Sequence, residues 1–241
     1  MEQSADNKLI LALDVETVAE ARELFAAMRE VVGAFKIGSQ LFTAAGPEFV
    51  RELAGAGARI FLDLKFHDIP NTVAAAGVEA ARLGVFMFNV HASGGSEMMR
   101  RTADAVRLAT EREGLAQPKV IAVTVLTSAD KGVLAEVGIN AEPETQVTHL
   151  ARLAAAAGLD GVVASPLEIE AVRGAVEQKD FLIVTPGVRP AGSATDDQRR
   201  VMTPGEAVRA GADYLVVGRA ILNAPDPVEA AIAISQEMKR G

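Results

Sequence analysis

Short apolar runs recur along the whole chain, and between them lie alanine-rich segments in which apolar residues return every three or four positions. Apolar or β-branched runs of this kind are typical of buried strands, whereas the longer period is typical of amphipathic helices. The pattern therefore predicts eight strands with helices between and after them. The strands are expected at residues 8–15, 34–38, 58–66, 85–93, 119–127, 159–165, 181–188 and 212–220.

Several predicted helices carry recognisable end signals. The first is expected to start after Thr17, a capping residue with Glu20 three positions on, and to end just before Gly33. The second is expected over residues 46–58, with similar signals. Glycines in the turns back into the sheet are expected at Gly57, Gly158 and Gly211.

The alternation of strands and helices predicts the fold class. Eight strand–helix alternations in one α/β chain fit a closed (β/α)8 TIM barrel better than an open sheet. No linker or change of composition divides the chain, so residues 1–241 are expected to form a single domain. A doubly wound open sheet is the alternative.

Composition and charge exclude several classes of protein. The 241 residues are 49% hydrophobic and carry a net charge of −8, which argues against a general nucleic-acid or membrane-surface role. Cysteine is absent, so disulfides and thiolate sites are excluded. The first residues are polar, and no apolar run reaches the roughly 20 residues of a membrane-spanning helix. We therefore expect a cytoplasmic protein that binds neither nucleic acid nor membrane.

Charged residues are threaded through one predicted strand, in the segment IFLDLKFHDIPNT at residues 60–72. Side chains alternate between strand faces, so Asp63 and Lys65 share a face, and Lys36 reaches Asp63 if their strands are neighbours. Asp68 follows the strand and either extends this charged row or points at another chain. The row is either a salt-bridge network that only stiffens the barrel or a catalytic group. Its position at the carboxyl end of a barrel strand favours catalysis.

A second candidate site follows the last two predicted strands. The loop GVRPAGSATDDQRR holds Arg189 and Gln198, and the last strand ends in Gly218 and Arg219 before a helical turn. Loops at these places in (β/α)8 barrels often bind phosphate through backbone N–H groups and arginine. The alternative is an ordinary surface loop, but the pattern favours a phosphorylated small molecule as ligand.

Residues that bind metals are not grouped convincingly. His67 and His91 lie near the predicted barrel mouth, but His149 is in a helical stretch, and the spacing is not that of a metal site. Asp14 and Asp63 are possible ligands, yet lysines beside Asp63 disfavour a divalent cation. We expect no metal and no cofactor.

Taken in order, several segments resemble the bacterial type of the orotidine 5′-phosphate decarboxylase family. They are LALD, KIG, FLDLKFHDIPNT, NVHASGG, AVTVLTS, VTPGVRP, DDQRRVMTP and VVGRAI, and the resemblance covers nearly the whole chain. The DxKxxD pattern alone also occurs in Mg²⁺-dependent sugar-phosphate barrels, so it is the continuation through IPNT and the other segments that makes the resemblance specific. Two alternatives are such a sugar-phosphate enzyme and a non-catalytic nucleotide-binding module.

The resemblance implies a cofactor-free lyase that converts orotidine 5′-monophosphate to uridine 5′-monophosphate and CO2, the last step of de novo pyrimidine synthesis. Lys65 would protonate C6 of the pyrimidine, and Asp63, Lys36 and Asp68 would complete the catalytic row. Asp68 and Thr72 would reach into the site of a second subunit, which implies a homodimer.

The resemblance also implies how the rest of the substrate is held. Asp14 and Lys36 would bind the ribose hydroxyls, Thr127 would contact the pyrimidine, and Pro186 would line the pocket. The 5′-phosphate would be bound by Arg189, Gln198, Gly218 and Arg219.

Overall fold

Eight parallel strands close into a barrel in the computed structural model, which describes residues 7–189 and 202–240. Each strand pairs with its neighbour in the chain, and β8 pairs with β1 to close the ring. The strands are β1 Leu9–Ala12, β2 Ala34–Gly38, β3 Ile60–Phe66, β4 Met87–His91, β5 Lys119–Val123, β6 Gly161–Val163, β7 Leu182–Pro186 and β8 Tyr214–Val217.

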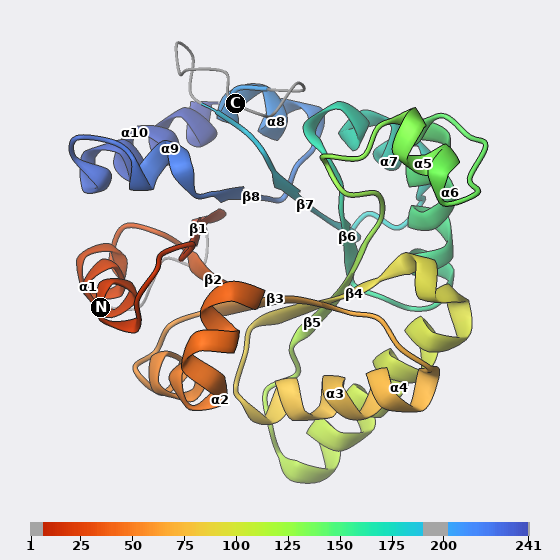
Figure 1. Ribbon diagram of the computed structural model, residues 1–241, viewed down its shortest axis with the longest axis horizontal. Coiled ribbons are helices and arrows are strands. Elements are labelled where there is room, and N and C mark those ends of the chain that lie inside the picture. The colour runs from red at the N-terminus through yellow and green to blue at the C-terminus, as the bar shows by residue number, and fades with distance from the viewer. Residues whose placement is uncertain (1–6, 190–201, 241) are drawn as a thin grey trace.

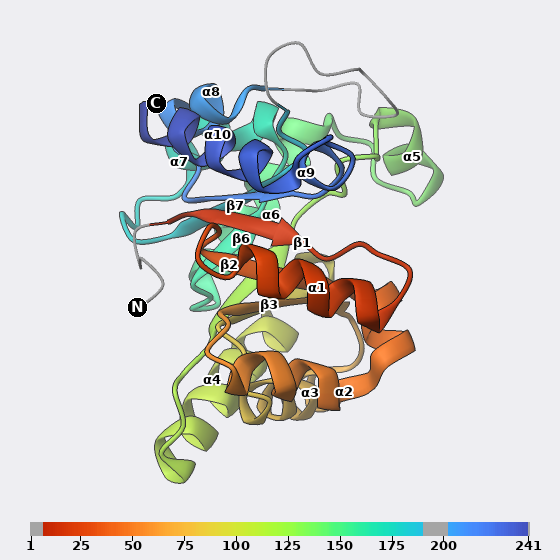
Figure 2. The ribbon, with the colours of Figure 1, turned by 90° about the vertical axis from the view of Figure 1, so that its left-hand side faces the viewer.

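Helices cover the outside of this ring (Figure 1). Figure 2 shows β1 with α1 on one side and α9 and α10 on the other. The α-helices are α1 Val18–Met28, α2 Ser39–Gly55, α3 Pro70–Arg82, α4 Gly95–Glu113, α5 Lys131–Glu136, α6 Pro143–Ala156, α7 Ile169–Ala175, α8 Pro204–Ala210, α9 Arg219–Leu222 and α10 Pro227–Arg240, with 3₁₀ turns η1 Ala92–Gly94 and η2 Pro166–Glu168.

The predicted fold class is confirmed, and the doubly wound open sheet is wrong because β1 and β8 pair instead of forming edges. All eight predicted strands are present, although most are shorter than expected. The extent of the domain over residues 1–241 stays a prediction, since residues 1–6, 190–201 and 241 lie outside the described part. Within the described part, no helix combines the length and apolar character needed to cross a membrane.

The core has two layers, because alternate side chains of each strand point to opposite faces. One layer lies between the strands and the surrounding helices and contains most of the buried apolar side chains. The other fills the inside of the barrel and is a separate, smaller cluster. Its buried members are Ile10, Ala12, Ala34, Phe61, Met87, Ile121, Val184 and Val216.

The first helix begins as predicted but ends earlier. The Thr17 hydroxyl accepts a hydrogen bond from the Glu20 N–H at 3.2 Å, as an N-cap does. Helix α1 ends at Met28, so the predicted end just before Gly33 is wrong. Gly33 has another role: a Cβ there would lie 1.6 Å from the carbonyl oxygen of Asn7, so only glycine permits this close approach of two backbone segments.

The second helix begins before its predicted start. Helix α2 starts at Ser39, directly after β2, and is interrupted by a kink at Gly46, where φ is 72°. The predicted start coincides with this kink. Pro47, directly after the kink, has no N–H to continue the helical hydrogen bonds. The three predicted turn glycines are confirmed with left-handed φ values of 88°, 80° and 110° at Gly57, Gly158 and Gly211.

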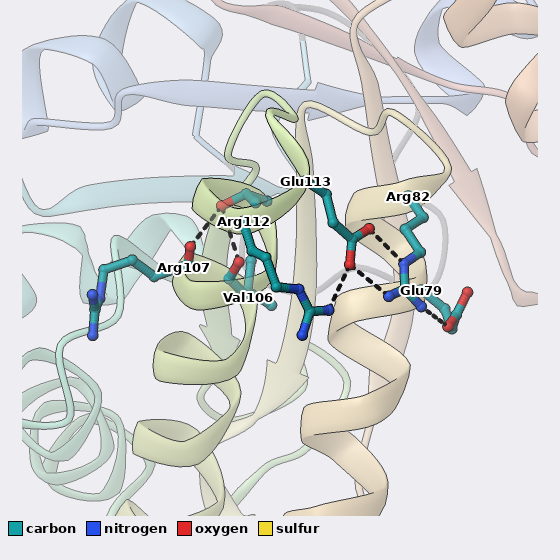
Figure 3. A network of polar contacts seen from close by, with 7 residues as sticks. Glu79, Arg82, Val106, Arg107, Arg112 and Glu113 are labelled. Atoms are coloured by element: carbon teal, nitrogen blue, oxygen red, sulfur yellow. Dashed lines mark hydrogen bonds and ion pairs between the residues drawn. The ribbon is translucent and has the colours of Figure 1, made fainter.

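A polar network joins the C-terminal ends of α3 and α4 (Figure 3). Arg82 donates two hydrogen bonds to Glu113, at 2.7 and 2.9 Å, and another to Glu79 at 2.6 Å. Hydrogen bonds from Arg82 and then from Arg112 lower the pKa of Glu113 to about 2. The network is exposed, so its contribution to stability is small. Its effect is to hold α3, which follows directly on the segment after β3, against α4.

Candidate active site

Four charged side chains form a row at the carboxyl ends of the first three strands. Nζ of Lys36, on β2, lies 2.9 Å from Oδ1 of Asp14, which follows β1, and 3.6 Å from Oδ2 of Asp63 on β3. Nζ of Lys65 lies 2.6 Å from the other oxygen of Asp63. The predicted alternation of Lys36, Asp63 and Lys65 is confirmed, and Asp14 extends it by one acid.

The backbone of β3 is irregular where it carries these charges. Its pairing with β4 runs through Leu62 and resumes at Phe66, with a register shift between them. Lys65 lies inside this bulge with φ of 55°, and no other non-glycine residue of the described chain has a positive φ. Strained backbone of this kind costs energy and is concentrated at functional sites. The sequence predicted a regular strand here.

A buried asparagine on β4 contacts both partners of the Lys65–Asp63 pair. The Asn89 amide donates to Oδ1 of Asp63 at 2.7 Å, and its carbonyl oxygen accepts the Lys65 backbone N–H at 2.8 Å. Asn89 is only 1% exposed. It was not among the predicted site residues, although an asparagine between the apolar residues Phe88 and Val90 of β4 is a signal for a buried polar contact.

The row keeps Asp63 ionised. Burial of this carboxyl favours its neutral form, but the charges of Lys36 and Lys65, together with hydrogen bonds from Lys65 and Asn89, outweigh burial and hold the pKa of Asp63 below its ordinary value. Lys36 is itself buried, so its ammonium depends on Asp14 and Asp63 for compensation. The group is therefore a compact set of alternating fixed charges.

The row lines one cavity of about 310 Å³ at the carboxyl ends of the strands. Ala12, Phe61 and Val216 of the inner core also line it and form its apolar floor. Most of the predicted site residues meet here, from six different strands or the loops after them. They are Asp14, Lys36, Asp63, Lys65, Thr127, Pro186, Arg189, Gly218 and Arg219.

Three predicted residues are not placed in this cavity. Asp68 and Thr72 are exposed and do not line it, and Oδ1 of Asp68 accepts the N–H of the neighbouring Ile69 at 2.6 Å. Of the two possibilities for Asp68, extension of the row within the same chain is therefore not seen. Gln198 lies outside the described residues.

Gly38, which was also not predicted, matters for the shape of the row. It ends β2 next to the Lys36–Asp14 pair, and a Cβ there would lie 3.0 Å from Nζ of Lys36 and 3.5 Å from Oδ1 of Asp14. The absence of a side chain at Gly38 leaves room for the ammonium.

The histidines are divided as expected. The rings of His67 and His91 lie 5.5 Å apart near the barrel mouth, while His149 is in α6. Burial, followed by the nearby His67 and Lys65, lowers the pKa of His91. In residues 7–189 and 202–240, no group of three or more His, Asp and Glu side chains has an arrangement that would hold a metal ion.

A closed barrel with lysines, aspartates and arginines converging on one cavity at its carboxyl end has the architecture of a (β/α)8-barrel enzyme. The chain belongs to the family described as "Orotidine 5'-phosphate decarboxylase / HUMPS family", whose sequence model matches residues 7–234. The resemblance found in the sequence is thereby confirmed.

Individual relatives agree with this assignment. Orotidine 5′-phosphate decarboxylase of Geobacter sulfurreducens is 56% identical over 237 residues, which cover 98% of both chains. The Moorella thermoacetica protein of the same name is 56% identical over 98% of this chain and 93% of its own. A crystal structure of orotidine 5′-phosphate decarboxylase from Lactobacillus acidophilus superposes with a TM-score of 0.84 at 38% identity, covering 97% of this chain and 99% of the other.

Proposed function

We propose that the chain is an orotidine 5′-phosphate decarboxylase, a carboxy-lyase that forms uridine 5′-phosphate and CO2 in pyrimidine synthesis. The observation that carries this proposal is the Lys65 ammonium held on Asp63 in a cavity that Arg189 and Arg219 also line. Full-length relatives with this name support the same activity.

The charged row suits the chemistry of this reaction. When the bond from C6 to the carboxylate breaks, its electron pair remains on C6, where the ring delocalises it poorly. A fixed cation beside C6 stabilises that charge, and a proton from the same group completes the product. We assign both tasks to Lys65, whose ammonium is held by Asp63, while Lys36 pairs with the other oxygen of that carboxylate. Asp63 would also repel the substrate carboxylate and favour its departure as CO2.

The remaining groups would position the nucleotide. Asp14 and Lys36 are near enough to each other to bind the ribose hydroxyls together, and we assign Thr127 and Pro186, which line the same cavity, to contact with the pyrimidine. For the phosphate we assign Arg189, Gln198, Gly218 and Arg219. Gly218 is the N-cap of the one-turn helix α9, which begins at Arg219, and both residues line the cavity.

A homodimer is part of the proposal. Asp68, Ile69 and Thr72 are all exposed on the segment after β3, and Ile69, an apolar side chain, is 66% exposed. A second copy seated on this segment would cover Ile69 and bring Asp68 and Thr72 to its own cavity. This explains why Asp68 lies apart from the row within one chain.

We place the reaction in the cytoplasm, which suits a chain without cysteine. The test of function is a single assay: orotidine 5′-phosphate is added to the purified protein in the presence of EDTA, and the loss of its absorbance is followed. Steady loss supports the proposal. Activity only with added Mg²⁺ and a sugar phosphate would indicate a Mg²⁺-dependent sugar-phosphate enzyme. Binding of the nucleotide without turnover would indicate a non-catalytic nucleotide-binding module.

A further inference from the structure

Asn89, on β4, does not line the active-site cavity. Its side-chain amide nevertheless contacts two residues of the row. The nitrogen donates to the Asp63 side chain, and the oxygen accepts from the Lys65 backbone. The amide nitrogen is 2.7 Å from Oδ1 of Asp63, and the amide oxygen is 2.8 Å from the N–H of Lys65. A side chain that is 1% exposed has no water to replace these partners.

The backbone contact replaces a missing hydrogen bond of the sheet. Regular pairing between β3 and β4 is interrupted between Leu62 and Phe66, which includes Lys65. The Lys65 N–H is therefore paired with a side chain on β4. Because a lysine with φ of 55° is strained, a fixed acceptor is needed to keep the bulge in this conformation.

The side-chain contact fixes the carboxylate. Oδ1 of Asp63 accepts from both Asn89 and the Lys65 ammonium, so these two donors together determine where the carboxylate lies. Its other oxygen faces Lys36. Asn89 thus sets the relative positions of the Lys65 backbone and the Asp63 carboxylate with one rigid planar group.

We propose that Asn89 is a positioning residue of the decarboxylase, which holds the β3 bulge and the Asp63 carboxylate so that the Lys65 ammonium points at the reacting carbon. This inference rests on the proposed function. It predicts that Asn89 affects the chemical step more than the binding of the nucleotide, whose assigned ligands it does not touch.

The first test compares kcat and KM of Asn89→Ala with those of Thr102→Val, a control at another buried polar residue, whose hydroxyl donates to the Met98 carbonyl within α4. We expect Asn89→Ala to lower kcat about 100-fold, the scale of a misplaced catalytic group, with KM within about twofold. Thr102→Val should retain kcat. An Asn89→Ala enzyme with unchanged kcat overturns the proposal. So does an equal loss of kcat in Thr102→Val when the two variants have the same thermal stability.

The second test uses Asn89→Asp, which keeps the shape and the acceptor oxygen but places a carboxylate against Asp63. Repulsion raises the pKa of the introduced carboxyl, and once protonated it again donates to Asp63. The kcat of this variant relative to the unaltered protein should therefore rise as pH falls. A purely structural role predicts a constant ratio, and that result contradicts the proposal. If neither variant folds, Asn89 serves the fold rather than positioning, and the proposal is also overturned.

A third measurement separates this inference from the proposed function. The Asp63 carboxyl is titrated by carbon NMR in the unaltered protein and in Asn89→Ala, with Asp63→Asn used to assign the signal. Loss of the Asn89 hydrogen bond should raise the pKa of Asp63, whether or not the protein decarboxylates anything. An inactive unaltered protein with this shift refutes the function alone, and an active one without the shift refutes the role of Asn89.

Discussion

The Lys65 ammonium lies 2.6 Å from Oδ1 of Asp63, although a single residue separates the two in the chain. The contact is made within a strand bulge in which Lys65 has a left-handed backbone. Asp63 is largely buried and its pKa is held low, so it is a fixed negative charge against which the ammonium is oriented. A lysine used only for stability would need neither the bulge nor a place in the cavity wall.

Replacement of Lys65 by alanine is expected to abolish decarboxylation while the fold survives. The variant loses both the cation and the proton donor, and we expect kcat to fall by about 10⁴-fold or more. Lys65→Arg is the matched variant, because it keeps the positive charge but holds its proton too tightly to transfer it readily. Circular dichroism and Tm confirm folding. Substantial turnover by Lys65→Ala would remove the proton-donor role.

Gly38→Ala tests whether the position of the Lys36 ammonium matters. The added Cβ would lie 3.0 Å from Nζ of Lys36, so the flexible lysine must move away from Asp14. The backbone, with φ −90° and ψ 178°, accepts alanine without strain, and Gly→Ala changes at such places stabilise by about 0.4–1 kcal/mol. We expect an unchanged or higher Tm with kcat/KM lowered about tenfold.

Gly55→Ala provides the control, since Gly55 ends α2 with open space around its Cβ. Kinetic constants of Gly38→Ala equal to those of Gly55→Ala would mean that the ammonium relaxes at no cost to function.

The row was predictable from the sequence to the extent that it depends on local pattern and strand order. Alternation along β3 placed Asp63 and Lys65 together, and adjacency of β2 and β3 brought Lys36 to them. The bulge was not predictable, because the left-handed backbone of Lys65 is maintained by Asn89 from another strand. The predicted end of α1, just before Gly33, was wrong because glycine is required there by the close approach of the Asn7 backbone and not by the end of a helix. The β3 bulge and the glycine at position 33 both depend on contacts between segments distant in the sequence, which a local pattern does not contain.

The ionisation of Asp63 predicts a pH dependence of stability. Its pKa is lower in the folded protein than its ordinary value of about 3.9, so its charge stabilises the fold above that pH. The contribution is lost as pH falls below about 3.9 and through the lower folded value. The free energy of unfolding of the unaltered protein should therefore approach that of Asp63→Asn as pH falls.

Urea unfolding at several pH values measures this difference, and other acids such as Glu113 cancel in the comparison. Fluorescence of Tyr214 can report it, because the chain has a single tyrosine and no tryptophan. A difference between the two proteins that stays constant from about pH 6 down to about pH 3, which is about one unit below the ordinary pKa of aspartate, would contradict the prediction.

Arg219→Ala tests whether phosphate binding contributes to the chemical step. Binding energy from a remote part of a substrate can be used to orient the reacting part, so its loss lowers kcat as well as raising KM. We expect both constants to change by about tenfold or more. Arg209→Ala, an exposed arginine on α8 away from the cavity, should leave both unchanged. An Arg219→Ala enzyme with only a raised KM would show that the phosphate contributes binding alone.

Mixing two inactive variants tests the shared active site. If Asp68 serves the cavity of a second subunit, a heterodimer of Lys65→Ala and Asp68→Asn chains contains one complete site, with Lys65 from one chain and Asp68 from the other. Random exchange of equal amounts gives heterodimers in about half of the dimers, so about a quarter of the unaltered activity should return. Lys65→Ala mixed with Lys36→Ala is the control, since both of these residues serve their own chain and no complete site forms. Equal behaviour of the two mixtures after verified exchange would show that Asp68 acts within its own chain or not at all.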